Sequence, residues 1–230
     1  MANGDIREHA FNSGGRVHQF KYREGDQHAT WWSFYDEQVV RDRHWHISPG
    51  DVVLDGGAAF GSYAIPALAM GAKVICFSPA DYDTGLLTEN VKCNPELSSR
   101  CLVVRDGLHE RDGWFDPDHS VFAVTPVPDT DQHAVSQWLR VRSLDSFIAE
   151  RGIDRIDWLK LDVEGAELAV LKGAVETLRR HRPKLLIECH NFHYPTMEQD
   201  VAAFVGSLGL GYQGEAHPHG AVSHAFFEVK

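Results

Sequence analysis

The sequence predicts an α/β protein with a doubly wound, mostly parallel sheet, and three observations carry this prediction. Short apolar runs of strand length alternate with helical patterns from residue 52 onward. The first run, Val52–Leu54, ends in Asp55 and a glycine-rich turn. No internal repeat or low-complexity tract interrupts the alternation. Strands alternating with helices at this spacing are typical of parallel sheets, whose ligands bind at the carboxyl ends of the strands.

The first strand, turn and helix are predicted from residues 52–71. Asp55 stands at the carboxyl end of the strand, and the glycines after it let a ligand approach the backbone closely. Ser62 is expected to cap the next helix, which carries apolar residues at 63–70 and stops at Gly71.

The later elements follow from the same periodicities. Strands are predicted at 73–77, 101–104, 156–162 and 184–190, helices at 84–94, 143–148, 164–178 and 201–208, and a closing hairpin from 212–213 and 225–229. Ser143 is expected to cap its helix, and the helix opened by Glu164 is expected to bury four residues. These four are Leu168, Leu171, Val175 and Leu178.

We interpret the whole chain, 1–230, as a single domain. Residues 1–30 hold few apolar positions and predict no element, whereas the aromatic-rich segment 31–45 predicts a helix. Residues 1–47 are therefore expected to form an N-terminal cap or substrate segment. Residues 108–140, rich in Asp, Pro, His and Gly, are expected to form a β insertion or flap before the fourth strand.

Composition excludes several classes of protein. A formal charge of −11 argues against a nucleic-acid or anionic-membrane binder, because both need a basic surface. The first 30 residues do not resemble a signal peptide, and no run reaches the ~20 apolar residues of a membrane helix. The cysteines have no paired metal-ligand spacing and are expected to be reduced thiols of a cytoplasmic protein without a zinc site.

Four blocks of sequence resemble the FkbM-type family of S-adenosylmethionine-dependent methyltransferases. They are Val53–Tyr63, Ser143–Phe147, Leu159–Glu167 with its K-x-D-x-E-G-A-E pattern, and Val170–Ala174. The resemblance covers roughly residues 50–190. It implies a Rossmann-like class I methyltransferase fold with a seven-stranded sheet. It also implies O-methyl transfer to a small hydroxylated acceptor, such as a sugar or secondary metabolite.

The cofactor-binding residues are expected around the first turn. A carboxylate at Asp55 can accept hydrogen bonds from the ammonium group of the cofactor, and Gly57 admits the ligand against the backbone. The resemblance adds the turn residues and two later positions, with Asp106 placed to recognise adenine. The added residues are Ala58, Gly61, Ser62, Tyr63, Ser78 and Asp106.

The fourth and fifth strands carry the predicted catalytic residues. Lys160, Asp162 and Glu164 alternate along the fourth strand, and Glu188 and His190 along the fifth. The lysine is expected to pair with Glu188 or Asp162, since a charge in an apolar strand is costly alone.

The catalytic set is therefore His190, Asp162 and Glu188. His190 is the expected general base for the acceptor hydroxyl, with His193 as the alternate. The main prediction includes no metal. As an alternative, the same three side chains could hold a Mg²⁺-like ion.

Ser78 departs from the family pattern, which usually has an acidic residue here to bind both ribose hydroxyls. Either cofactor binding is weaker, or Asp81 or Asp83 supplies the carboxylate. The serine leaves open an NADP-dependent oxidoreductase and a non-catalytic binding module with a methyltransferase fold. The identity of the acceptor and the oligomeric state are not determined by the sequence, and a homodimer is compatible with it.

Overall fold

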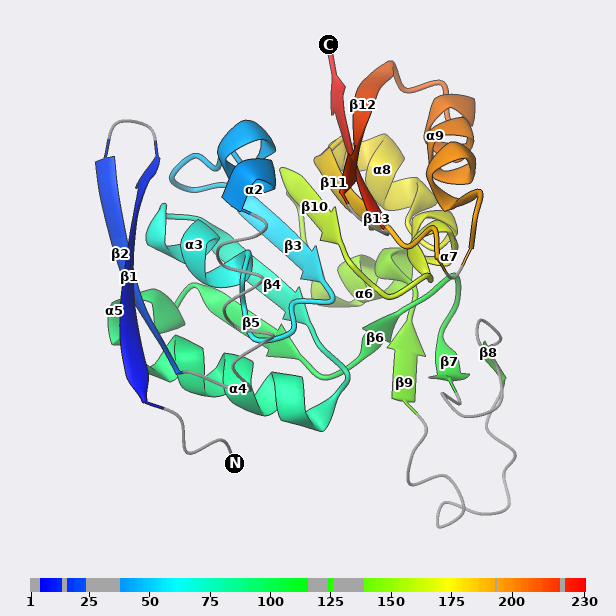
Figure 1. Ribbon diagram of the computed structural model, residues 1–230. Helices are drawn as coiled ribbons and strands as arrows, with labels where there is room; N and C mark the ends of the chain where they lie inside the picture. Colours follow the sequence, from blue (N-terminus) through cyan, green and yellow to red (C-terminus); the bar gives the residue numbers. More distant parts are fainter. Residues whose placement is uncertain are drawn as a thin grey trace, which may run out of the picture. The chain divides into compact units, whose positions relative to one another are not determined.

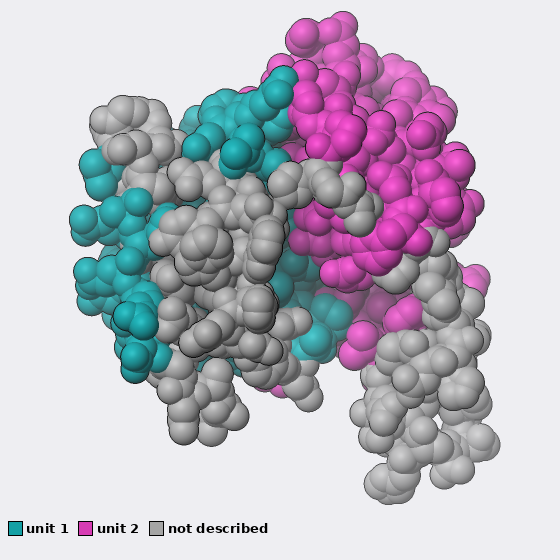
Figure 2. Space-filling view, in the orientation of Figure 1, with its two compact units in different colours: residues 1–104, 156–160 teal, residues 105–155, 161–230 magenta. Residues whose placement is uncertain are grey.

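Two groups of elements make up the structure, a computed structural model that describes residues 5–13, 16–23, 38–115, 124–125, 139–192, 194–219 and 222–230. Unit 1 comprises Met1–Val104 with Ile156–Lys160, and unit 2 comprises Arg105–Arg155 with Leu161–Lys230 (Figure 2). The strand order of the seven-stranded sheet is β12-β13-β11-β10-β3-β4-β5. The predicted doubly wound, seven-stranded α/β fold is thereby confirmed.

The strands of unit 1 match the sequence prediction closely. They are β3 (Val52–Gly56), β4 (Lys73–Phe77), β5 (Cys101–Val104) and most of β10 (Trp158–Leu161). β3 pairs in parallel with β4, and β4 with β5 (Figure 1). Val53 and Leu54 are fully buried, which confirms the prediction of a buried strand here. The register places Asp55 opposite Cys76, at the carboxyl end of the strand.

Helices cover the strands of unit 1. They are α2 (Gln38–His44), α3 (Ala64–Ala69), α4 (Asp81–Lys92) and α5 (Pro95–Ser98). α2 falls within the helix predicted at 31–45, whose aromatic residues Trp31, Trp32, Phe34 and Tyr35 lie outside the described residues. The expectation that Ser62 caps α3 is wrong. The cap position is Tyr63, and no side chain accepts a hydrogen bond there.

An N-terminal hairpin was missed by the sequence reading. β1 (Ile6–Ser13) and β2 (Arg16–Arg23) pair antiparallel, and β2 packs on α3 and α4. Asn94 ties the hairpin down, since its Oδ1 accepts from the Lys21 N–H at 2.7 Å and its Nδ2 donates to the Lys21 carbonyl at 2.6 Å. Backbone pairing explains why a segment poor in apolar residues is nevertheless ordered as strands.

Unit 2 contains an antiparallel group of strands and a small second sheet. β11 (Lys184–Cys189) and β12 (Tyr212–His219) both pair antiparallel with β13 (Val222–Val229), which confirms the closing hairpin. The second sheet has the order β6-β9-β7-β8, with β6 at Gly107–Leu108, β9 at Leu139–Arg142, β7 at Gly113–Phe115 and β8 at Val124–Thr125. These strands agree with the β insertion predicted at 108–140, where they are described.

The helices of unit 2 are α6 (Leu144–Arg151), α7 (Glu167–Lys172), α8 (Val175–His181) and α9 (Met197–Ser207). The predicted serine cap of α6 is confirmed, since Ser143 accepts from the Ser146 N–H at 3.2 Å. None of the helices in the described parts of the chain has the length and apolar character that crossing a membrane requires.

The single helix predicted from Glu164 to residue 178 is wrong in two places. Glu164 and Gly165 have positive φ angles of 54° and 101°, so they form a turn and the helix starts only at α7. The chain then breaks between α7 and α8 at Gly173, where a Cβ would lie 2.4 Å from the His109 carbonyl oxygen. Leu171 and Leu178 are fully buried, whereas Leu168 and Val175 are half-buried.

Candidate active site

The turn after β3 is shaped by its backbone. The N–H groups of Gly57 and Ala58 both donate to the Phe77 carbonyl, at 3.0 Å each. Gly57 and Gly61 have φ angles of 81° and 100°, which favour glycine. A Cβ on Gly61 would lie 2.8 Å from Ile65 Cγ1, so a side chain at this position has no room.

Asp55 precedes this turn and is 1% exposed. A carboxylate held at the carboxyl end of a parallel strand, beside a glycine-rich turn, fits a ligand that carries an ammonium group. Asp55 and Gly57 therefore fit the amino-acid part of S-adenosylmethionine, whereas the space beside Gly61 is taken by Ile65 and Leu87.

A second group of unit 1 residues surrounds Tyr63, which is 1% exposed. The Lys160 ammonium lies 4.6 Å from the centroid of the Tyr63 ring, and the Arg41 guanidinium lies 5.4 Å from it. The Trp45 ring lies edge-on to the same ring, with the two ring centroids 5.3 Å apart. The aromatic face accommodates the buried lysine. The expected pairing of Lys160 with Glu188 or Asp162 stays a prediction.

Ser78 follows β4 and is 2% exposed. Its N–H donates to the Val104 carbonyl at 3.0 Å, and its carbonyl accepts from the Thr84 hydroxyl of α4. Asn90, further along α4, donates to the Phe60 carbonyl at 2.8 Å and so ties the helix to the glycine turn. The side chains of Asp81 and Asp83, the alternative ribose ligands, lie outside the described residues.

Unit 2 holds a histidine surrounded by carboxylates. His190 directly follows β11 and is 3% exposed. Its Nδ1 lies 2.7 Å from Glu167 Oε1. Its Nε2 lies 3.4 Å from Glu164 Oε2, 3.6 Å from Asp162 Oδ1 and 4.0 Å from Glu188 Oε1. One ring nitrogen therefore faces a single buried acid, and the other faces three carboxylates that are more exposed.

This environment sets the pKa of His190. Burial lowers the pKa, but the hydrogen bond and charge of Glu167, with the charges of Asp162 and Glu164, outweigh burial and raise it to about 9. The imidazole is therefore mostly protonated at neutral pH. Desolvation raises the pKa of Glu164, and the charges of Asp162, Glu188 and Glu167 add to this effect while His190 opposes it.

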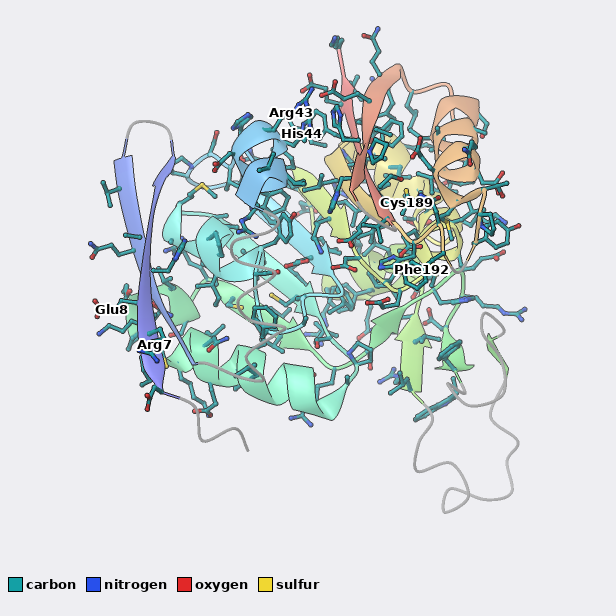
Figure 3. All side chains as sticks on the ribbon, in the orientation of Figure 1. Arg7, Glu8, Arg43, His44, Cys189 and Phe192 are labelled. Carbon is teal, nitrogen blue, oxygen red and sulfur yellow. The ribbon has the colours of Figure 1, made fainter. Side chains whose placement is uncertain are left out.

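Two further side chains adjoin the cluster. The ring of Phe192, 54% exposed, lies edge-on at 5.5 Å from the His190 ring; Figure 3 labels Phe192 together with Cys189, the last residue of β11. His224 of β13, 2% exposed, places its Nε2 3.4 Å from Glu188 Oε2.

The structure brings together the predicted set of Asp162, Glu188 and His190. Their ligand atoms lie within 4.8 Å of one another, a spacing that one divalent cation could bridge, so the magnesium alternative stays open. Asp106 lies apart from this set in the sequence, with its Oδ1 3.9 Å from Arg140 Nε. His193 lies outside the described residues.

Sequence reasoning assigned no role to Glu167, although it closes the K-x-D-x-E-G-A-E block. It is 0% exposed, and its Oε1 also accepts from the Gly165 N–H at 3.0 Å. The sequence did hold one indication of its role: Glu167 stands at the start of a helix whose apolar residues were expected to be buried. Such a residue is buried only if its carboxylate has partners.

The sheet, the glycine turn and the acidic block together define a Rossmann-like methyltransferase fold. The sequence profile described as the methyltransferase FkbM domain matches residues 55–213. The chain therefore belongs to the FkbM methyltransferase family, as its sequence blocks predicted.

Two curated relatives act as methyltransferases by name. The chain is 27% identical over 149 residues to the 2-O-methyltransferase NoeI of Sinorhizobium fredii NGR234, covering 58% of this chain and 61% of NoeI. It is 27% identical over 148 residues to the hexuronic acid methyltransferase AglP of Haloferax volcanii, covering 63% of this chain and 58% of AglP.

A third relative is much longer. The chain is 26% identical over 195 residues to the AMB antimetabolite synthetase AmbE of Pseudomonas aeruginosa, covering 69% of this chain and 9% of AmbE. The chain thus spans about three fifths of two relatives and a small part of the third.

A solved structure shows the same fold. The methyltransferase FkbM from Methylobacillus flagellatus KT superposes with a TM-score of 0.66 at 22% identity, covering 84% of this chain and 47% of that chain.

Proposed function

We propose that this chain is an S-adenosylmethionine-dependent methyltransferase that methylates a hydroxyl group of a small molecule. Family membership supports methyl transfer. The observation that favours a hydroxyl acceptor is His190, a titratable group whose Nε2 lies among three carboxylates. The sugar-directed names of NoeI and AglP support a carbohydrate hydroxyl as one acceptor class to test first.

Unit 1 residues would hold the cofactor. Bound S-adenosylmethionine supplies a methyl group on a sulfonium centre, which a nucleophilic oxygen can displace. Asp55 would accept hydrogen bonds from the ammonium group of the cofactor, and the backbone at Gly57 would lie against it. Ser78 would offer one neutral hydroxyl to the ribose.

His190 would take the proton from the acceptor hydroxyl. With a pKa of about 9, only about one imidazole in a hundred is neutral at pH 7. That neutral fraction is a stronger base than an ordinary histidine, because basicity rises with pKa. The surrounding carboxylates then stabilise the imidazolium that forms. Turnover should therefore rise with pH until about 9.

Cofactor binding can be measured by titration calorimetry with S-adenosylmethionine, its demethylated product and NADP. We expect the first two to bind and NADP not to bind. Asp55→Asn should weaken binding by about 1–3 kcal/mol, the range for a hydrogen bond to a charged group. Asp154→Asn, at a side chain 90% exposed, is the matched control and should leave affinity unchanged.

Two outcomes would contradict the proposal. NADP binding without S-adenosylmethionine binding would support an oxidoreductase. Tight cofactor binding with no methyl transfer to any of a panel of neutral sugars, uronic acids and phenols would favour a binding module. Transfer of a labelled methyl group, located by mass spectrometry, decides between turnover and binding alone.

A further inference from the structure

We propose that Glu167 is a positioning residue that fixes the tautomer and orientation of His190, leaving Nε2 as the atom that exchanges the proton. The tautomer and orientation of His190 follow from contacts within unit 2. Only the link to turnover rests on the proposed function.

The contact between the two side chains is short and buried. Glu167 Oε1 lies 2.7 Å from His190 Nδ1, and the two side chains are 0% and 4% exposed. A neutral imidazole carries its proton on one nitrogen and accepts at the other. Because an ionised carboxylate only accepts, Glu167 selects the tautomer protonated at Nδ1. The lone pair of the neutral ring is then on Nε2.

The same carboxylate oxygen also orders the turn that precedes α7. Glu167 Oε1 accepts from the Val163 N–H at 3.3 Å and from the Gly165 N–H at 3.0 Å. The turn is held with Glu164 at a φ of 54°, which is uncommon for a residue with a side chain. Glu167 therefore fixes the backbone that carries Asp162 and Glu164, the two carboxylates nearest to Nε2.

The charged groups around His190 come from four segments. Glu167 belongs to α7, Asp162 and Glu164 to the turn after β10, and Glu188 to β11. His224 on β13 faces Glu188 at 3.4 Å. All four carboxylates favour the imidazolium and burial opposes it. Glu167 is the closest and the most buried of the four, so the loss of its charge should have the largest effect on His190.

The proposal is tested by following His190 in the nuclear magnetic resonance spectrum of the full chain labelled with ¹⁵N-histidine. His190→Gln identifies the signals. We expect a His190 pKa near 9 in the natural protein and, above that pH where the ring is neutral, the tautomer protonated at Nδ1. Glu167→Gln keeps the shape of the side chain and removes its charge, so the His190 pKa should fall toward 6.5. Its amide oxygen can still accept from Nδ1–H, so the tautomer should be kept in Glu167→Gln and lost only in Glu167→Met, which removes the acceptor as well.

Two further variants control for structural damage. Glu167→Asp keeps the charge and should hold the pKa above 6.5 even if the turn is disturbed. Glu176→Gln, at a side chain 75% exposed on α8, makes the same chemical change elsewhere in unit 2 and should change neither property. An unaltered His190 pKa in Glu167→Gln, or an unaltered tautomer in Glu167→Met, would overturn the proposal. A His190 pKa that changes on adding a chelator would assign Nε2 to a metal ion and also overturn it.

A kinetic measurement tests the link to turnover separately. In Glu167→Gln the acid limb of the kcat profile should move to lower pH, while the KM for S-adenosylmethionine stays unchanged. A residue with a merely structural role would lower kcat at every pH without moving the limb. If no acceptor is turned over, the proposed function fails while the spectroscopic result stands by itself.

Discussion

The glycine turn of unit 1 is shaped by the backbone, whereas the His190 cluster of unit 2 is defined by charged side chains. In the turn, φ angles of 81° at Gly57 and 100° at Gly61 and two hydrogen bonds to one carbonyl set the shape. In the cluster, four carboxylates around one imidazole set the charge. A turn shaped by its backbone should keep its structure when pH changes but lose stability when a glycine gains a side chain. A cluster defined by charges should change its stability and activity with pH, and should lose activity when a charged side chain is replaced.

The largest expected effect is at the charge site. His190→Ala should lower kcat by about 10²–10⁴ and leave the affinity for S-adenosylmethionine nearly intact, because the general base is lost and the turn of unit 1 is unchanged. The measurement is a methyl-transfer assay alongside calorimetry. His190→Gln is made in parallel, since alanine leaves Glu167 buried without its partner. His46→Ala, at an exposed position, is the control. An unchanged kcat in both His190 variants would remove this residue from the mechanism.

The turn should be broken by adding one methyl group. Gly61→Ala places a side chain at a φ of 100° and within 2.8 Å of Ile65, so we expect a loss of about 2–4 kcal/mol in the free energy of unfolding. Gly50→Ala has a similar φ of 90° but open space, and should cost only about 1–2 kcal/mol. Urea denaturation compares the two variants. Equal losses would show that packing around Gly61 adds nothing.

Stability should depend on pH through the cluster. The folded pKa of His190, about 9, is above the unfolded value of 6.5. Its contribution is therefore fully present below pH 6.5 and is lost as pH rises through 9, for a total of about 3 kcal/mol. Urea denaturation at pH 6 and at pH 9.5 should show this loss in the natural protein and a smaller one in His190→Gln. Identical pH dependence in both proteins would contradict the assignment.

The smallest expected effect is on cofactor affinity, when a carboxylate is introduced at Ser78. Ser78→Glu should tighten S-adenosylmethionine binding by roughly tenfold, because an acid can accept from both ribose hydroxyls where serine engages one. Ser78→Thr, which adds no charge, is the matched control for the buried position. Weaker binding in Ser78→Glu alone would indicate that another carboxylate, such as Asp81 or Asp83, already serves the ribose.

Local pattern determined most of the fold. The apolar runs at 52–54, 73–77 and 101–104 became strands as predicted. A short apolar run bounded by turn residues is enough to identify a strand, even where, as at 101–104, it is only partly buried. The boundary between α7 and α8 could not be predicted in this way. Gly173 could end a helix, but apolar residues at helical spacing continue past it to Leu178. In the structure the space for a Cβ at Gly173 is taken by the His109 carbonyl, from a distant segment.

The sequence by itself determined the family, the sheet and the identity of Asp55, Asp162, Glu188 and His190 as neighbours of strand ends. Tertiary structure decided the rest. It paired the N-terminal hairpin through backbone hydrogen bonds, which apolar periodicity does not report. It also placed Glu167 against His190, 23 residues away in the sequence. Burial and long-range charge set the His190 pKa, and both depend on which segments the fold brings into contact.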